Sequence, residues 1–359
     1  MEGRRLEIAP LDEEAMRLAR ERWDRIAKPL NSLGWLEDAI VKIAGIYGVP
    51  AVNLEKKAVV VFCADNGVVE EGVTQTGQEV TAVVTENLTK GESCVCLMAE
   101  KAGAQVIPVD IGVKNPLSCQ GKVRNPLVNC HLMDGTRNFV REPAMDYRTA
   151  VKAIETGMDL VRELKEQGIG ILATGEMGIG NTTTSSAVIS VLLNVDPQSV
   201  TGRGAGLSDE GMKKKISVIR QGIVLWKPDR NDPVDVLSKV GGLDLAGLTG
   251  VFLGGARYRL PVVIDGVISG AAALAAAALC PEAVGYMLAS HCSAEPAGEM
   301  VLNALGIKPI IYGNLCLGEG TGAVTLFPLL DMAVAVYGRM STFSQIKIEE
   351  YHHFECGGL

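Results

Sequence analysis

The sequence predicts an α/β protein with a doubly wound, mostly parallel sheet. Short continuous apolar runs, which are typical of buried parallel strands, alternate with helical patterns through most of the 359 residues. We expect strands at residues 58–62, 104–109, 169–173, 250–254, 261–264 and 309–312. Polar residues follow several of these runs, and the right-handed crossover rule brings such loops together at one edge of the sheet. Ligands bind at that edge in folds of this class.

Before the first strand, apolar residues spaced by three and four predict a pair of helices. The first covers residues 12–30 with Asp12 as its N-cap, and the second covers residues 36–47, up to Gly48-Val49-Pro50. Residues 114–142 have weak periodicity and are predicted to form a long excursion. Further helices are expected at residues 79–88, 93–102, 185–193 and 271–279.

The composition is that of a globular protein, with 47% hydrophobic and 21% charged residues. A net charge of −8 argues against a general surface for nucleic acids or anionic membranes. The most apolar run, residues 271–279, is too short to span a bilayer, and no apolar signal core follows the first five residues. Nine cysteines without a CxxC pair, and four histidines without an HExxH pattern, predict reduced thiols and no metal site. We therefore expect a cytoplasmic protein.

A glycine-rich stretch between an expected strand and an expected helix is the first candidate site. It runs from Thr174 to Thr184 with the sequence TGEMGIGNTTT. In a strand, turn and helix start, free backbone N–H groups converge on an anion. The spacing approaches that of a P-loop, but Asn181 stands where a nucleoside-triphosphate site needs a lysine. The stretch predicts a phosphate cradle that is not an NTPase site, and a βα turn without a ligand is the alternative.

Two glutamates in glycine-rich surroundings are candidates for chemistry. Glu176 lies inside the cradle, although a carboxylate repels an anion. Its presence suggests another role, such as binding a sugar hydroxyl. Glu319 lies in the run Gly318-Glu319-Gly320-Thr321-Gly322, after the strand expected at 309–312. A carboxylate confined in such a loop can act as a general base. A helix-capping glutamate in a tight turn is the alternative.

Residues 262–270 resemble the diphosphate-sugar motif of phosphoribosyltransferases that use phosphoribosyl pyrophosphate. Those enzymes carry two adjacent acids after the strand, whereas here Asp265 is followed by Gly266. Without paired acids we expect neither bound magnesium nor a pyrophosphate leaving group.

Several motifs together resemble the nicotinate-nucleotide–dimethylbenzimidazole phosphoribosyltransferases of cobalamin lower-ligand synthesis. In chain order they are Ser32-Leu33-Gly34 with Leu36-Glu37, Ala64-Asp65-Asn66-Gly67-Val68, Gln78-Glu79-Val80-Thr81, Gly175-Glu176-Met177-Gly178-Ile179-Gly180-Asn181-Thr182-Thr183, Gly204-Ala205-Gly206-Leu207, His291-Cys292-Ser293-Ala294-Glu295 and Gly318-Glu319-Gly320-Thr321-Gly322. Each motif is weak alone, but their order and spacing over most of the chain are highly specific.

The resemblance implies transfer of the phosphoribosyl group of nicotinate mononucleotide to dimethylbenzimidazole, giving alpha-ribazole phosphate and nicotinate without a cofactor or metal. It makes Glu319 the general base that removes the proton of the incoming base as its nitrogen attacks C1′ of the ribose. Glu176 and Lys215 match family positions near the ribose and near the phosphate or the developing charge. The substrate-binding positions that it implies are Gly178, Gly180, Asn181, Thr182, Gly204, Asp265, Ser293 and Leu317.

The resemblance also implies a domain organisation and a homodimer. A small helical domain built from both chain termini packs on a large α/β domain in this family. We accordingly expect residues 1–57 to form the N-terminal part of the small domain and residues 58–312 the large Rossmann-like domain with the active site. Residues 313–359 are expected to form the catalytic loop and a C-terminal helix that joins the small domain.

The positions near the incoming base depart from the family pattern. Many members carry a Ser-Pro-Tyr-Pro-like run before Gln-Glu-Val-Thr and a glutamine shortly after it, whereas this chain has Thr74-Gln75-Thr76-Gly77 and then Val83 or its neighbour. Thr74 and Val83 are therefore candidates for contact with the base. Fewer polar groups there leave a phenolic or purine acceptor open.

Two interpretations of other kinds also remain open. The chain could be a catalytically silent subunit of a hetero-oligomeric phosphoribosyltransferase, although an intact Glu319 speaks against this. A kinase or ATPase using the turn at 175–182 would need a lysine at position 181 and an acid partner for magnesium.

Overall fold

The computed structural model describes residues 7–118 and 123–353 of the chain. Its centre is a seven-stranded sheet with the order β3-β2-β1-β4-β5-β6-β7, and every pair of neighbouring strands is parallel. The strands are β1 (Lys57–Ala64), β2 (Ala104–Gly112), β3 (Val128–Asn129), β4 (Ile171–Met177), β5 (Val262–Ile264), β6 (Met287–His291) and β7 (Pro309–Ile311). The strand order changes direction between β1 and β4, which is where folds of this kind bind ligands.

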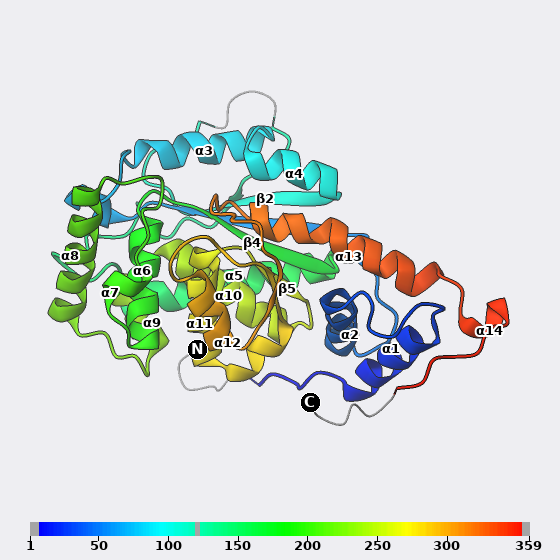
Figure 1. Cartoon of the computed structure of the whole chain (residues 1–359). Helices are drawn as coiled ribbons and strands as arrows, with labels where there is room; N and C mark the ends of the chain where they lie inside the picture. The colour runs from blue at the N-terminus through cyan, green and yellow to red at the C-terminus, as the bar shows by residue number, and fades with distance from the viewer. Residues whose placement is uncertain (1–6, 119–122, 354–359) are drawn as a thin grey trace.

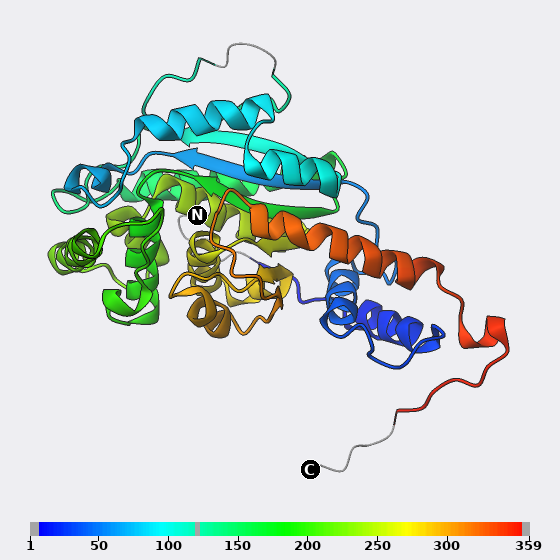
Figure 2. The ribbon, with the colours of Figure 1, turned by 45° about the horizontal axis from the view of Figure 1, so that its top comes forward.

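Helices cover both faces of the sheet (Figures 1 and 2). Alternate residues of β1 point to opposite faces of the sheet and belong to two separate cores. Ala58, Val60 and Phe62 face a core that contains α5, α6, α10 and α11. Val59 and Val61 face a second core that contains α2, α4 and α13. The helices are α1 (Glu13–Arg25), α2 (Trp35–Tyr47), α3 (Glu79–Lys90), α4 (Cys94–Ala102), α5 (Tyr147–Glu166), α6 (Asn181–Leu193), α7 (Pro197–Val200), α8 (Asp209–Trp226), α9 (Pro233–Val240), α10 (Leu243–Arg257), α11 (Val267–Leu279), α12 (Gly298–Leu305), α13 (Thr321–Arg339) and α14 (Phe343–Ile346), with 3-10 turns η1 (Gly67–Glu71) and η2 (Pro281–Tyr286).

The predicted α/β class and doubly wound sheet are confirmed, but three elements differ from the expectation. The run at 250–254, predicted as a strand, lies inside α10. Nearly every residue of α10 is buried, so the helix has no polar face and its sequence lacks the periodicity that marks an amphipathic helix. The strand β6 was not predicted, and β3 lies in the region expected to be an excursion.

The two ends of the described chain meet beside the sheet, at the end of α13 that lies away from the loops after β4 and β5 (Figure 2). Arg22 of α1 donates from Nε to the carbonyl of Tyr337 of α13 over 2.8 Å, and the rings of Trp23 and Tyr337 lie 5.0 Å apart. The first helix ends at Arg25, before the predicted Leu30, and Ile26 instead pairs with Thr342 in an isolated antiparallel bridge. Elements of the predicted units 1–57 and 313–359 therefore pack on each other.

The helix α13 runs from the carboxyl edge of the sheet to this helical end (Figures 1 and 2). Among the described helices it alone is long and apolar enough to cross a membrane by length and composition, with a mean hydropathy of 1.4 over its 18-residue window. Half of that window is buried inside the protein, and Phe327 and Leu330 belong to the core beneath it. A core helix passes the same test of length and composition.

Candidate active site

A cavity of about 220 Å³ opens at the carboxyl ends of β4, β5 and β6. Most of the predicted site residues line it, although they come from several separate regions of the chain. They are Glu176, Gly178, Asn181, Thr182, Gly204, Asp265, Ser293, Leu317 and Glu319. Among the described residues, no lysine or arginine lines this cavity, while four carboxyl groups do, from Glu176, Asp265, Glu295 and Glu319.

The turn after β4 has the geometry that its glycines predict. Gly178 packs so closely that a Cβ there would lie 2.3 Å from the Ala64 carbonyl oxygen, and Gly180 has a φ of 96° at the N-cap of α6. Two N–H groups of this turn are already engaged. Ile179 donates to Thr81 Oγ1 over 3.1 Å, and Asn181 donates to the Gly178 carbonyl over 3.0 Å. The turn therefore offers an anion fewer N–H groups than its sequence spacing suggests.

Glu176 is the sixth residue of β4 and is almost fully buried, with 6% of its surface exposed. Its Oε2 accepts a hydrogen bond from the side-chain amide of Asn181, and its Oε1 lies against Gly318, where a Cβ would approach it to 2.5 Å. Burial raises its pKa well above the ordinary value, and the charges of Asp244 and Asp265 add to this effect. The side chain of Asn181 is thus committed to Glu176, which is one reason that position does not need a lysine.

Glu319 sits in an unusual backbone segment at the mouth of the cavity. Gly318, Glu319 and Gly320 have φ values of 94°, 59° and 95°, so three consecutive residues adopt positive φ. The Glu319 residue is half-buried, and its Oε2 accepts the backbone N–H of Val95, in the first turn of α4, over 3.3 Å. It therefore contacts a helix start, as the capping interpretation expects, but the helix belongs to another part of the chain and the carboxylate still lines the cavity.

Asp265 follows β5 and has 3% of its surface exposed. Its two carboxylate oxygens accept backbone N–H groups from the start of α13: Oδ1 from Ala323 over 2.9 Å and Oδ2 from Gly320 over 3.1 Å. Burial raises its pKa to about 6 against the lowering effect of these bonds. Asp265 lines the cavity as predicted, but its oxygens are directed at the protein backbone.

Lys215 of α8 lies behind the cavity wall and does not line it. Its ammonium group donates to Thr182 Oγ1 over 2.8 Å and to the Gly202 carbonyl over 3.0 Å, with 1% of the residue exposed. Burial lowers its pKa to about 8. Thr182, which accepts one of these hydrogen bonds, lines the cavity.

Three predicted positions lie elsewhere. Thr74 and Gly180 line a second cavity of about 90 Å³, on the other side of the turn at 178–182. Val83 lies on α3 with 59% of its surface exposed and lines neither cavity. The predicted substrate contact of Val83 therefore stays a prediction, and it would need a surface other than the walls of these two cavities.

Two titratable residues that line the cavity belong to a motif of the resemblance but were not among the predicted site residues. His291 ends β6, and its Nδ1 lies 2.9 Å from Ser290 Oγ. Glu295 lies against Gly202, where a Cβ would fall 1.4 Å from a Glu295 carboxylate oxygen. The sequence does not predict β6, and it is this strand that places His291 at the cavity.

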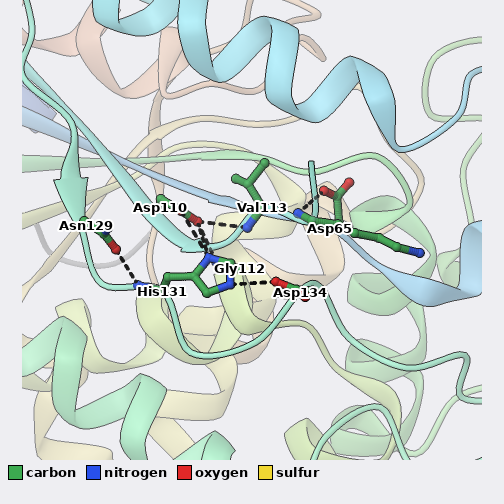
Figure 3. A network of polar contacts seen from close by, with 8 residues as sticks. Asp65, Asp110, Gly112, Val113, Asn129, His131 and Asp134 are labelled. Carbon is green, nitrogen blue, oxygen red and sulfur yellow. Dashed lines mark hydrogen bonds and ion pairs between the residues drawn. The ribbon is translucent and has the colours of Figure 1, made fainter. Parts of the chain in front are cut away.

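A second cluster of acids lies at the end of β2, outside the cavity (Figure 3). Asp110 Oδ1 accepts the N–H groups of Gly112 and Val113 over 3.0 and 2.8 Å, and its Oδ2 lies 3.2 Å from His131 Nδ1. The other ring nitrogen of His131 lies 3.0 Å from Asp134. Asp65 accepts the N–H of Lys114 nearby over 2.8 Å. Within residues 7–118 and 123–353, no group of three or more His, Cys, Asp or Glu side chains could hold a metal ion.

Comparison with known proteins identifies relatives over nearly the whole chain. The sequence model of a family described as Phosphoribosyltransferase (DBI_PRT) matches residues 8–348. A nicotinate-nucleotide–dimethylbenzimidazole phosphoribosyltransferase of Acetivibrio thermocellus is 47% identical over 344 residues, covering 96% of this chain and 97% of that protein. A protein of the same name from Ruminiclostridium cellulolyticum is 47% identical over 348 residues, covering 97% of each. The crystal structure of CobT from Thermus thermophilus matches with a TM-score of 0.87 and 35% identity, over 94% of this chain and 99% of that one.

Proposed function

The chain belongs to the DBI_PRT family of phosphoribosyltransferases, and from this membership we propose that it transfers the phosphoribosyl group of nicotinate mononucleotide to dimethylbenzimidazole in cobalamin biosynthesis. The products are alpha-ribazole phosphate and nicotinate. The observation that carries the proposal is the placement of Glu319 beside Glu176 and the glycine turn of β4–α6, in a chain whose full-length relatives are named for this reaction.

In the proposed reaction, a lone pair on one benzimidazole nitrogen attacks C1′ of the ribose. The bond between C1′ and the pyridinium nitrogen breaks, and its electron pair neutralises the leaving nicotinate ring. Glu319 takes the proton from the other ring nitrogen of the benzimidazole, so the product is neutral at that ring. Its position at the mouth of the cavity, with one oxygen held by the N–H of Val95, leaves the other oxygen to accept this proton.

Glu176 and Lys215 act on the donor nucleotide in this proposal. Burial favours the neutral acid at Glu176, which can donate a hydrogen bond to a ribose hydroxyl, and positive charge developing on the sugar favours its ionised form. Lys215 holds Thr182 at the start of α6, where the helix dipole and the remaining N–H groups attract the phosphate. A monophosphate needs less positive charge than a triphosphate, which agrees with a cavity that no lysine or arginine lines among the described residues.

We propose that the physiological acceptor is dimethylbenzimidazole, with a phenol or a purine as the alternatives. Met177, Leu315 and Leu317 supply an apolar part of the cavity wall. A competition assay tests this choice: purified protein receives nicotinate mononucleotide with equal concentrations of dimethylbenzimidazole, adenine and p-cresol, and products are separated by mass. A dominant benzimidazole product is expected. A dominant phenolic or purine product contradicts the acceptor but keeps the reaction class, and no product with any acceptor supports a silent subunit.

We also propose a homodimer that acts in the cytoplasm. Leu97 of α4 and Leu317 of the loop are 57% and 59% exposed, and they flank the contact between Val95 and Glu319. Leu317 lines the cavity, and large apolar side chains exposed near one another are typical of a surface that a partner covers. Light scattering after size-exclusion chromatography should give about twice the 38.0 kDa of the chain. A mass of one chain contradicts the dimer.

A further inference from the structure

The turn that carries Glu319 adopts a backbone conformation that a glutamate rarely adopts. A non-glycine residue is strained in the left-handed region, and Glu319 adopts this conformation between two glycines that also have positive φ. The helix that follows, α13, has Gly320 as its N-cap, and no side chain of that residue satisfies the first N–H groups of the helix. The left-handed conformation of Glu319 and the N–H groups at the start of α13 both need stabilising contacts from residues outside the turn.

Part of this support is close packing on the sheet. A Cβ on Gly175 of β4 would lie 2.3 Å from the Glu319 carbonyl oxygen, and one on Gly320 would lie 2.6 Å from a methyl carbon of Val59 of β1. The turn thus lies directly on two neighbouring strands. Packing of this kind restricts where the backbone can move, but it provides no hydrogen bond to the free N–H groups at the start of α13.

Asp265 provides those hydrogen bonds. It follows β5, and its carboxylate spans two N–H groups of the turn and the first helical turn, on Gly320 and Ala323. Gly322, between them, packs against His291 and Asp265 with room for no side chain. Asp265 therefore does for α13 what an N-cap side chain does for other helices, although it is 55 residues from Gly320 in the sequence.

We propose that Asp265 is a positioning residue that holds the turn at 318–320 in the left-handed conformation and so aims the Glu319 carboxylate at the cavity. This goes beyond the family resemblance, which places Asp265 among the nucleotide-binding residues. Both of its oxygens face backbone N–H groups of the turn and of α13, and an ionised carboxylate has no donor to offer a phosphate. Its expected effect on catalysis depends on the proposed function, whereas its effect on the turn does not.

The test is the substitution Asp265→Asn in the full chain. An asparagine keeps one oxygen acceptor but turns an NH2 group toward the second backbone N–H, so one of the two bonds is replaced by a repulsive contact. We expect kcat to fall about 100-fold, because a misplacement of about 1 Å costs that much in a positioned catalytic group. The dissociation constant for nicotinate mononucleotide should change by less than about threefold, since the donor site is left in place. In the Glu319→Gln background the same substitution should have little further effect on kcat.

Hydrogen–deuterium exchange gives a second measurement that needs no activity. Peptides that contain Gly320 and Ala323 should exchange faster in Asp265→Asn than in the wild type, while peptides from β1 and β4 should not change. Asp232→Asn is the matched control, because Asp232 accepts two N–H groups at the start of α9, from Val234 and Asp235, and does not line the cavity. In this variant, backbone amides at the start of α9 should exchange faster, and kcat should not change.

Two outcomes would overturn the proposal. If Asp265→Asn weakens nucleotide binding as much as it lowers kcat/KM, Asp265 contacts the substrate. If exchange at Gly320 and Ala323 is unchanged, Asp265 does not hold the turn. A wild-type protein that fails to react with any acceptor contradicts the proposed function instead, and the exchange measurement still decides the role of Asp265.

Discussion

Two clusters of carboxyl groups lie at the carboxyl edge of the same parallel sheet, and they differ in what surrounds their oxygens. At the end of β2, Asp110 is bound by two backbone N–H groups and by His131, which also contacts Asp134 (Figure 3). At the ends of β4 and β5, Glu176 and Asp265 are buried and no lysine or arginine among the described residues lines their cavity. Both oxygens of Asp110 have partners, one of which is an imidazole, whereas Glu176 accepts a hydrogen bond from the neutral amide of Asn181 and has acids as its charged neighbours.

The difference separates a stabilising cluster from a functional one. Burial and neighbouring acids raise the pKa of a carboxyl group and cost stability, and hydrogen bonds to its oxygens reduce that cost. Burial raises the pKa of Glu176 and of Asp265, and the charge of Asp244 contributes to the shift at Glu176. Acids with raised pKa values that gather in one cavity indicate a functional site. Substitutions in the two clusters should therefore have opposite profiles of activity and stability.

The largest effect is expected for Glu319→Gln. The amide cannot take the proton of the incoming base, and the loss of a general base lowers kcat by about 100- to 10,000-fold. Binding of nicotinate mononucleotide should remain within about threefold of wild type, since glutamine fills the same space. Steady-state kinetics with dimethylbenzimidazole and a binding titration with the nucleotide measure the two effects. A variant within tenfold of the wild-type kcat would contradict the assignment of Glu319 as general base.

Glu176→Ala should lower kcat/KM by about 10- to 100-fold, through weaker nucleotide binding, weaker transition-state stabilisation or both. An unchanged kcat/KM would remove Glu176 from the site.

Glu176→Gln adds a stability measurement to this comparison. The folded state raises the pKa of this acid above its ordinary value of 4.5, so wild-type stability falls relative to the variant as the pH rises above that value. Glu176→Gln should therefore melt at a higher temperature than the wild type at pH 8 and at a similar temperature at pH 4. Thermal unfolding at the two pH values measures this difference, and equal melting temperatures at pH 8 would show that Glu176 costs the fold nothing.

Sequence patterns predicted the parts of this site that are local along the chain. Glu176 and Glu319 stood out because glycines flank them, and the strand, turn and helix around the first followed from its apolar neighbours. The sequence predicts Asp265 as a site residue but not its hydrogen bonds to Gly320 and Ala323, because these partners lie 55 and 58 residues further along the chain. No local pattern encodes a bond between the end of β5 and the start of α13.

The errors in the fold have a common physical cause. The run at 250–254 has the composition of a buried strand, and α10 is buried on all sides, so periodicity cannot separate the two structures. The strand β6 is five residues long, Met287–His291, and so short a run does not establish the period of a strand. Because β6 was not predicted, the position of His291 in the cavity wall was not predicted either.

A smaller effect is expected from pH acting through Lys215. Burial lowers its pKa to about 8, so its positive charge is present below that pH and is lost above it. The anionic nucleotide should bind less well as the charge disappears, and kcat/KM for nicotinate mononucleotide should fall about tenfold between pH 7 and pH 9. Lys215→Met should have a lower value at pH 7 and should lack this decline. A decline that persists in Lys215→Met would assign it to another group.

The smallest effect on turnover is expected in the cluster at the end of β2. His131→Asn removes the contacts that join Asp110 to Asp134 beside β3, and it should lower the free energy of unfolding by about 1 kcal/mol, because His131 is partly exposed to solvent. Turnover should stay within twofold of wild type, since this cluster does not line the cavity.

Urea unfolding and steady-state kinetics on the same preparation measure both quantities. Asp134→Asn is the matched control, because the Asp134 side chain is 80% exposed and its loss should cost less than that of His131. A fall in kcat of more than fivefold in His131→Asn, at unchanged stability, would reverse the assignment of the two clusters. The acids at the end of β2 would then belong to the chemistry, and an imidazole partner would not mark a structural carboxylate at this edge of the sheet.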